Sequence, residues 1–155
     1  MSYMGEADMK KFNCGKSVAG GGRFEWSKPK YLIGKSDKRW QEFQDIKKEW
    51  GFTPDECWNL YHTIAIFILP RLTFFRENYG GMFTPASLKE QDNKKWQKML
   101  DKMIWSFKQI AKENFDEPPK FYLKKYEYME ACKVYQKDID EGLDLFREYF
   151  LALWY

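Results

Sequence analysis

The 155-residue sequence predicts an all-α protein. Apolar residues recur at three- and four-residue spacing along most of the chain after residue 36, and capping residues or glycine stand at the ends of these patterns. About four such segments with short connections are typical of a mostly antiparallel helical bundle. We therefore expect one helical domain over residues 36–155. A glycine-rich, mostly irregular arm over residues 1–35 precedes it, with a short hairpin around Pro29 as an option.

The first predicted helix follows Ser36, which can act as its N-cap. Apolar residues from Trp40 to Trp50 form one stripe at helical spacing, and Gly51 is placed to end the helix. The second helix has a clearer start signal. Residues 53–56, Thr-Pro-Asp-Glu, form a capping box with proline at the first helical position.

The second predicted helix continues to about Asn78 and is apolar on all sides over residues 64–69. A helix of this kind is usually surrounded by others, so we expect it at the centre of the bundle. Pro70 lies inside the helix and removes one backbone hydrogen bond. Because the apolar register continues through Leu72 and Phe75, we expect a kink in this central helix rather than a break.

Two further segments complete the predicted bundle. The third helix spans residues 91–114 and carries the most regular apolar stripe in the sequence. The remainder after Pro118 and Pro119, residues 120–155, has the pattern of one long helix or two in line, with Gly142 as a candidate bend.

Composition limits the classes of function. Aromatic residues make up 19% of the chain, which is typical of an aromatic-rich core and leaves open, as the alternative, a core plus an exposed face for a protein partner or a second copy. The three cysteines follow no pattern, so we expect reduced thiols and no zinc site. We expect neither a signal peptide nor a membrane span, since no apolar run is long enough. Phosphate-loop, dinucleotide-binding and nucleophile-elbow motifs are absent from the sequence, so we expect no cofactor and no catalytic residue.

The candidate binding residues are cations and one tryptophan. Lysines recur along one face of the third predicted helix, and Trp105 lies beside them, a combination that suits phosphate groups and stacked bases. Two arginines follow Pro70 and can bind freed backbone carbonyls, a buried carboxylate or an anion. The candidates are Lys94, Lys98, Lys102, Trp105, Lys112, Arg71 and Arg76. An ordinary solvated lysine face and a structural role for the arginines are the open alternatives.

Two carboxylate pairs and the single histidine are weaker candidates. Glu127 with Glu130, and Glu141 with Asp144, have a spacing that suits magnesium ligands in all-α nucleotide hydrolases. All four are expected on one solvent-facing arc of the last helix. His62 has no second histidine and no carboxylate three or four residues away, so we interpret it as a packing residue.

Three stretches of the sequence carry a resemblance: WNLYHTIAIFILPRLTFFRE, WQKMLDKMIWSFKQI and EGLDLFREYFLALWY. In their order and spacing they resemble a family of small uncharacterised proteins encoded by tailed bacteriophages, with motifs WxLxHTxAxxIxPxLxxF, LDxMIWxF and EGLxLFxxYFxxLW. The resemblance covers about residues 58–155 and leaves out the glycine-rich arm. It implies a phage origin and action inside an infected bacterium, but no activity. Tyr61 departs from the pattern, in which an acidic residue precedes the histidine.

The sequence leaves three hypotheses for function. The first is a non-enzymatic phage accessory protein in the host cytoplasm that binds a host or defence protein, a nucleotide signal or other copies of itself. The second is a nucleic-acid-associated protein that uses the lysine face of the third helix. The third is a magnesium-dependent nucleotide hydrolase, which requires carboxylates from another helix to meet the four named above.

Overall fold

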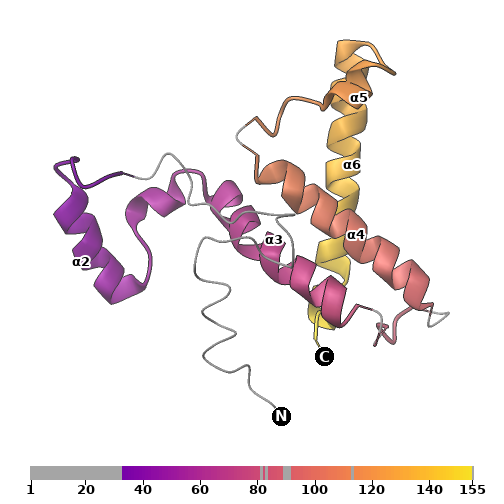
Figure 1. Cartoon of the computed structure of the whole chain (residues 1–155), viewed down its shortest axis with the longest axis horizontal. Coiled ribbons are helices and arrows are strands. Elements are labelled where there is room, and N and C mark those ends of the chain that lie inside the picture. The colour runs from indigo at the N-terminus through magenta and orange to yellow at the C-terminus, as the bar shows by residue number, and fades with distance from the viewer. Residues whose placement is uncertain (1–32, 81, 83, 89–91, 113, 155) are drawn as a thin grey trace. The chain divides into compact units, whose positions relative to one another are not determined.

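The computed structural model describes residues 33–80, 82, 84–88, 92–112 and 114–154, and every regular element among them is helical (Figure 1). The longer helices are α2 (Trp40–Trp50), α3 (Leu60–Asn78), α4 (Asn93–Ile110) and α6 (Tyr128–Glu148). The shorter elements are the 3-10 helix η1 (Pro54–Cys57), α5 (Lys120–Leu123) and the 3-10 helix η2 (Phe150–Ala152). The predicted all-α class is confirmed. The hairpin around Pro29 lies outside the described residues.

The chain divides into two compact units, residues 1–67 and 68–155, and the division falls within α3. The first unit holds α2, η1 and the start of α3, and the second holds the remaining helices. The predicted boundary between an arm and a helical domain near residue 36 stays a prediction.

In the first unit, α2 starts at Trp40, later than predicted. Ser36 is not its N-cap, because Asp37 forms the turn before the helix and accepts the Arg39 N–H at 2.9 Å. Gly51 ends α2 as predicted: its φ of 83° is left-handed, and its N–H donates to a carbonyl of the last helical turn.

The predicted capping box is present, but it opens a 3-10 turn instead of the long helix. The Thr53 N–H donates to the Glu56 carboxylate at 3.0 Å, and η1 follows. Asp55 within this turn points inward, 2% exposed, and accepts the Ile33 N–H at 2.7 Å. The α-helical hydrogen bonds of α3 begin only at Leu60. A capping box supplies the first hydrogen bonds of a 3-10 helix or of an α-helix. The sequence signal therefore placed the turn correctly, but it placed the start of the α-helix six residues too early.

Helix α3 continues through Pro70 to Asn78, so the alternative of a break into two helices is excluded. The helix is buried along one side, over residues 65, 66, 69 and 70, rather than on all sides. Leu60, Ile64 and Phe67 are 50%, 44% and 53% exposed, which corrects the expectation that other helices surround its apolar middle. In the described part of the chain, no helix is long and apolar enough to cross a membrane.

In the second unit, α4 and α6 pack against each other and provide most of the core. Asp92 accepts the N–H groups of Lys94 and Lys95 and thereby starts α4 two residues later than predicted. The last segment is divided into α5, α6 and η2 instead of one or two long helices. The buried core side chains of α4 and α6 are Trp96, Leu100, Met103, Phe107, Ile110, Ala131, Tyr135 and Ile139.

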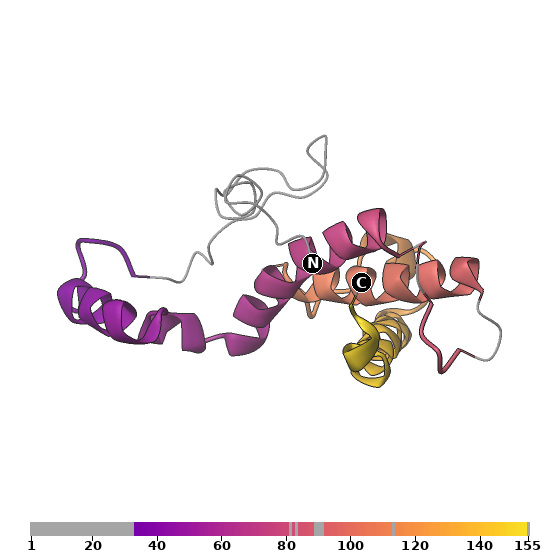
Figure 2. The same ribbon diagram turned by 90° about the horizontal axis from the view of Figure 1, so that it is seen from below.

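Helices α4 and α6 cross each other, as both views show (Figures 1 and 2). Gly142 lies where they come closest: a Cβ at this position would be 2.0 Å from Ser106 Oγ and 2.6 Å from the Lys102 carbonyl oxygen. Helix α6 passes through Gly142 without interruption. The predicted bend at Gly142 is therefore wrong, because the glycine is required for close approach of the two helices.

Candidate functional site

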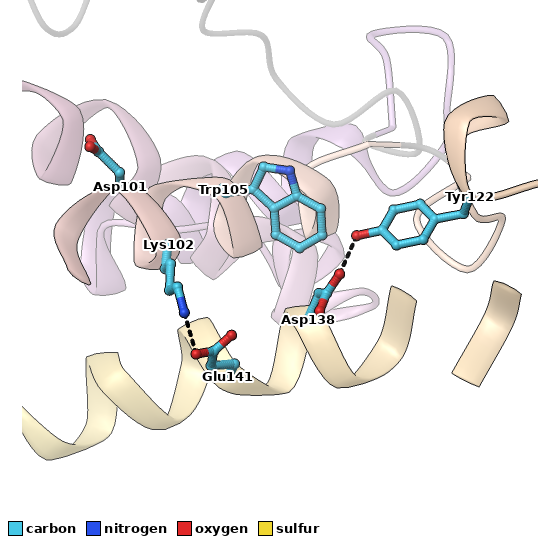
Figure 3. Close-up of a pocket in the computed structure, with 6 residues that line it drawn as sticks. All are labelled: Asp101, Lys102, Trp105, Tyr122, Asp138 and Glu141. Carbon is cyan, nitrogen blue, oxygen red and sulfur yellow. Dashed lines mark hydrogen bonds and ion pairs between the residues drawn. The ribbon is translucent and has the colours of Figure 1, made fainter. Parts of the chain in front are cut away.

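A cleft of about 410 Å³ opens beside this crossing, and we call it the α4–α6 cleft (Figure 3). Its lining residues are Asp101, Lys102 and Trp105 from α4, Tyr122 from α5, and Asp138 and Glu141 from α6. Figure 3 shows the indole ring of Trp105 between Lys102 and Tyr122, with Asp138 and Glu141 on the facing helix. The cleft lies entirely within the unit of residues 68–155.

Helical spacing brings the cleft residues together. Asp138 and Glu141 are three residues apart on α6 and therefore lie on one face. Lys102 and Trp105 have the same spacing on α4. Pro118 and Pro119 end the connection from α4, and α5 begins directly after them. Tyr122 of α5 lies at the end of the cleft next to Asp138.

Close packing at the crossing sets the width of the cleft. Because Gly142 has no side chain, α6 approaches α4 until Ser106 Oγ can donate to the Asp138 carbonyl at 3.4 Å. Ser106 and Gly142 are both buried. The side chains next to them, Lys102 on one helix and Asp138 and Glu141 on the other, therefore face each other across a short gap.

Carboxylates outnumber cations in the α4–α6 cleft. Asp101 forms a two-pronged ion pair with Arg76, with the shorter N–O distance 2.8 Å. Glu141 forms an ion pair with Lys102. Asp138 accepts a hydrogen bond from the phenol of Tyr122. Among the described residues, Asp138 is thus the cleft carboxylate whose side-chain partner is neutral.

The phenol of Tyr122 stays protonated over the ordinary pH range. Burial raises the pKa of Tyr122 far above its usual value of 10.0, and the hydrogen bond to Asp138 and the charge of that carboxylate raise the pKa further. Tyr122 therefore acts as a fixed neutral donor that orients Asp138 without neutralising its charge.

An aromatic cluster supports the α5 end of the cleft. Trp105 and Tyr122 each lie edge-on to Tyr135, with ring centroids 6.0 and 5.5 Å away. Tyr135 is 2% exposed, and no described residue forms a hydrogen bond with its hydroxyl. Burial raises the pKa of Tyr135, as does the negative charge of Asp116. The ring of Tyr135 therefore packs the cluster, whereas its hydroxyl forms no hydrogen bond within the described part of the chain.

This contrast predicts opposite results for two equivalent substitutions. Tyr122→Phe removes the donor to a carboxylate, so we expect a loss of about 1–3 kcal/mol in the free energy of unfolding. Tyr135→Phe removes an unsatisfied buried hydroxyl, so we expect a change within about 0.5 kcal/mol or a gain of about 1 kcal/mol. Urea denaturation followed by circular dichroism measures both. An equal loss for the two variants would show that the Tyr135 hydroxyl has a partner such as bound water.

The structure brings together only some of the sequence-predicted binding residues. Lys102 and Trp105 line the cleft, whereas Lys94 and Lys98 are exposed on α4 outside it. Lys112 lies just beyond α4 and donates to the Gln109 side chain. Burial, followed by the charge of Lys108, lowers the pKa of Lys112. Of the predicted lysines, Lys102 therefore lines the cleft, and binding by the lysine face stays a prediction.

The two arginines after Pro70 differ in their surroundings. Arg76 binds Asp101 of α4, an exposed carboxylate rather than the buried one considered from the sequence. Burial lowers the pKa of Arg71, which does not line the α4–α6 cleft. His62 lies in the other unit, where its ring is edge-on to Tyr61 at 6.5 Å.

The two carboxylate pairs on α6 do not converge. Glu127, Glu130, Glu141 and Asp144 are all exposed. Glu141 nevertheless faces α4 and pairs with Lys102, while Asp144 lies 3.6 Å from Arg147 on its own helix. The expectation that Glu141 faces only solvent is therefore wrong. Over the residues described, no group of three or more histidine, cysteine or acidic side chains is placed to hold a metal ion.

Sequence reasoning missed two cleft residues, Tyr122 and Asp138, as candidates. Asp138 lies one turn before Glu141, but an aspartate on an exposed helix face has no distinguishing signal. Comparison with protein-family models, curated proteins and solved structures finds no match to this chain.

Proposed function

We propose that this protein acts by binding, as a non-enzymatic accessory protein whose α4–α6 cleft receives part of a partner protein. The observation that supports this proposal is the cleft itself: an accessible indole ring beside oriented polar groups, held by two closely packed helices. Tryptophan in a rigid concave setting is typical of residues that dominate protein–protein binding. The proposed setting, the cytoplasm of a phage-infected bacterium, rests on the sequence resemblance alone.

A capture experiment tests this proposal. Wild-type protein is immobilised and exposed to lysate of a host bacterium, beside Trp105→Ala and Trp58→Ala. Trp58 is half exposed in the other unit and serves as a matched control for loss of an indole. We expect wild type and Trp58→Ala to capture the same protein in equal amounts. Trp105→Ala should capture about tenfold less of it. Equal capture by all three would contradict the proposal.

A second copy of the chain is the other partner considered from the sequence. Light scattering after size-exclusion chromatography measures the molar mass of the protein and so distinguishes self-association from binding to a different protein. If the partner is another copy, wild type and Trp58→Ala elute as an oligomer and Trp105→Ala as a smaller species. A concentration-independent monomer in all three restricts the partner to another protein.

Nucleic-acid binding is a second candidate function, and one observation favours it. Three exposed lysines lie at the start of α4, and within the described residues none of them forms an ion pair: Lys94, Lys95 and Lys98. Replacing the three by glutamine should weaken DNA or RNA binding and reduce the slope of log affinity against log salt by about three. Fluorescence anisotropy at several salt concentrations measures this slope. Glutamine at the exposed Lys133 and Lys137 of α6 is the control, and absence of binding at low salt would end this candidate.

A further inference from the structure

We infer that the ligand of the α4–α6 cleft is a guanidinium group, presented by an arginine of the partner protein. In this arrangement Trp105 provides the stacking surface, Asp138 provides the counter-charge, and Lys102 competes with the ligand for Glu141. The inference deepens the proposed function and rests on it.

The charges of the cleft favour a cation. Asp101 and Glu141 already have cationic partners in Arg76 and Lys102. Asp138 is part-buried, and the neutral phenol of Tyr122 is the only donor to its side chain among the described residues. One negative charge is left after pairing, and it lies at the edge of a partly desolvated space where Coulomb interactions are stronger than in bulk water. A phosphate or carboxylate ligand would instead meet three carboxylates.

The shape of the cleft favours a planar cation. The indole ring of Trp105 lies on one side of the cleft and the carboxylates of α6 on the other (Figure 3). A guanidinium is flat, stacks on aromatic rings and donates in a fork that matches a carboxylate. Arginine therefore fits both surfaces at once, whereas an ammonium presents no flat face for stacking.

Lys102 is the internal competitor. Its ammonium pairs with Glu141, and both side chains are 52% exposed. Exposed ion pairs of this kind are weak, so an entering guanidinium can displace the flexible lysine from Glu141. Both Asp138 and Glu141 are then available to the ligand. Removing the lysine charge should consequently strengthen binding.

The test uses two small probes, N-acetyl-arginine amide and N-acetyl-citrulline amide. Citrulline keeps the length and planarity of arginine but carries no charge. Titration of isotope-labelled protein, followed by nuclear magnetic resonance, reports each site separately, including the Trp105 indole N–H. We expect arginine to shift this signal and the amides around Asp138, and citrulline to need a concentration about tenfold higher.

Three variants identify the roles. Asp138→Asn retains an acceptor for Tyr122 and removes the charge, so arginine binding should weaken by about tenfold. Lys102→Met removes the competitor and should strengthen binding about threefold or more. Lys98→Met, one turn earlier on the exposed face of α4, changes the net charge equally and should leave affinity within about twofold.

Each result bears on the inference. Equal shifts with arginine and citrulline, no shift with either probe, or weaker binding to Lys102→Met would overturn it. If Lys102→Met and Lys98→Met gained the same affinity for the arginine probe, the change in net charge alone would explain the gain. That result would overturn the role of Lys102 as a competitor. The proposed function fails separately, through unchanged capture of the partner by Trp105→Ala. Loss of capture without arginine binding would keep the proposed function and reject the guanidinium.

Discussion

Gly142→Ala is expected to lower the free energy of unfolding by about 3 kcal/mol, although alanine is the better helix former by about 1 kcal/mol. The added Cβ would lie 2.0 Å from Ser106 Oγ and 2.6 Å from the Lys102 carbonyl. The hydroxyl can rotate away from the new methyl, but the backbone carbonyl cannot. Helices α4 and α6 must therefore separate, at a cost in packing that exceeds the gain in helix propensity.

Two further variants separate packing from propensity. Lys137→Ala is an exposed site on the same helix and should change the free energy of unfolding by less than about 0.5 kcal/mol in urea denaturation. Ser106→Ala in the Gly142→Ala background removes the nearest atom and leaves the contact with the Lys102 carbonyl, so it should recover only part of the loss. A Gly142→Ala protein as stable as wild type would contradict the close crossing. Gly142→Ala would also widen the cleft and so weaken the binding of any ligand that contacts both helices.

The elements with explicit end signals could be predicted from the sequence. Gly51 ends α2 through a left-handed backbone, and the capping box at Thr53 marks the turn that it was expected to mark. These features are local, because the residues that form the hydrogen bonds are neighbours in the chain. The type of helix after the box was not predictable, since one set of capping bonds serves a 3-10 turn and an α-helix.

Features that depend on distant residues could not be predicted. Gly142 looks the same in the sequence whether it marks a bend or a close contact, and only the approach of Ser106 from α4 decides between them. The same holds for Glu141: its spacing with Asp144 suggested a solvated face, but the crossing of the helices brings Lys102 to it. Trp105 was singled out for its neighbouring lysines, yet its surroundings in the fold are mostly carboxylates.

The carboxylates that face Trp105 bear on the choice between nucleic-acid binding and protein binding. A lysine face predicts anion binding only if its cations stay available, and Lys102 is already paired with a carboxylate of the facing helix. Lys94 and Lys98 are exposed on α4, and they do not line the cleft that contains the indole ring of Trp105. Within the cleft, the charge of Asp138 is therefore better suited to a cationic group than to a phosphate, whereas the exposed lysines keep nucleic-acid binding as the second candidate function.

Trp96→Ala should be the most destabilising single truncation on α4, with a loss of about 3–5 kcal/mol in the free energy of unfolding. Trp96 is 1% exposed, and its ring packs against Tyr149 at 5.5 Å between centroids. Truncation leaves a large cavity that fixed backbone elements on both sides cannot fill. Urea denaturation, followed by circular dichroism at the helical band, measures the change.

Trp105→Ala is the matched control for this prediction, because it removes the same ring from the same helix. Trp105 is only partly buried and borders a cleft already open to solvent, so its loss creates less new cavity. We expect a cost of about 1–2 kcal/mol and a native circular dichroism spectrum. That difference is what allows Trp105→Ala to report on binding rather than on unfolding. If Trp105→Ala were as destabilising as Trp96→Ala, the indole would belong to the core and not to a site for a partner.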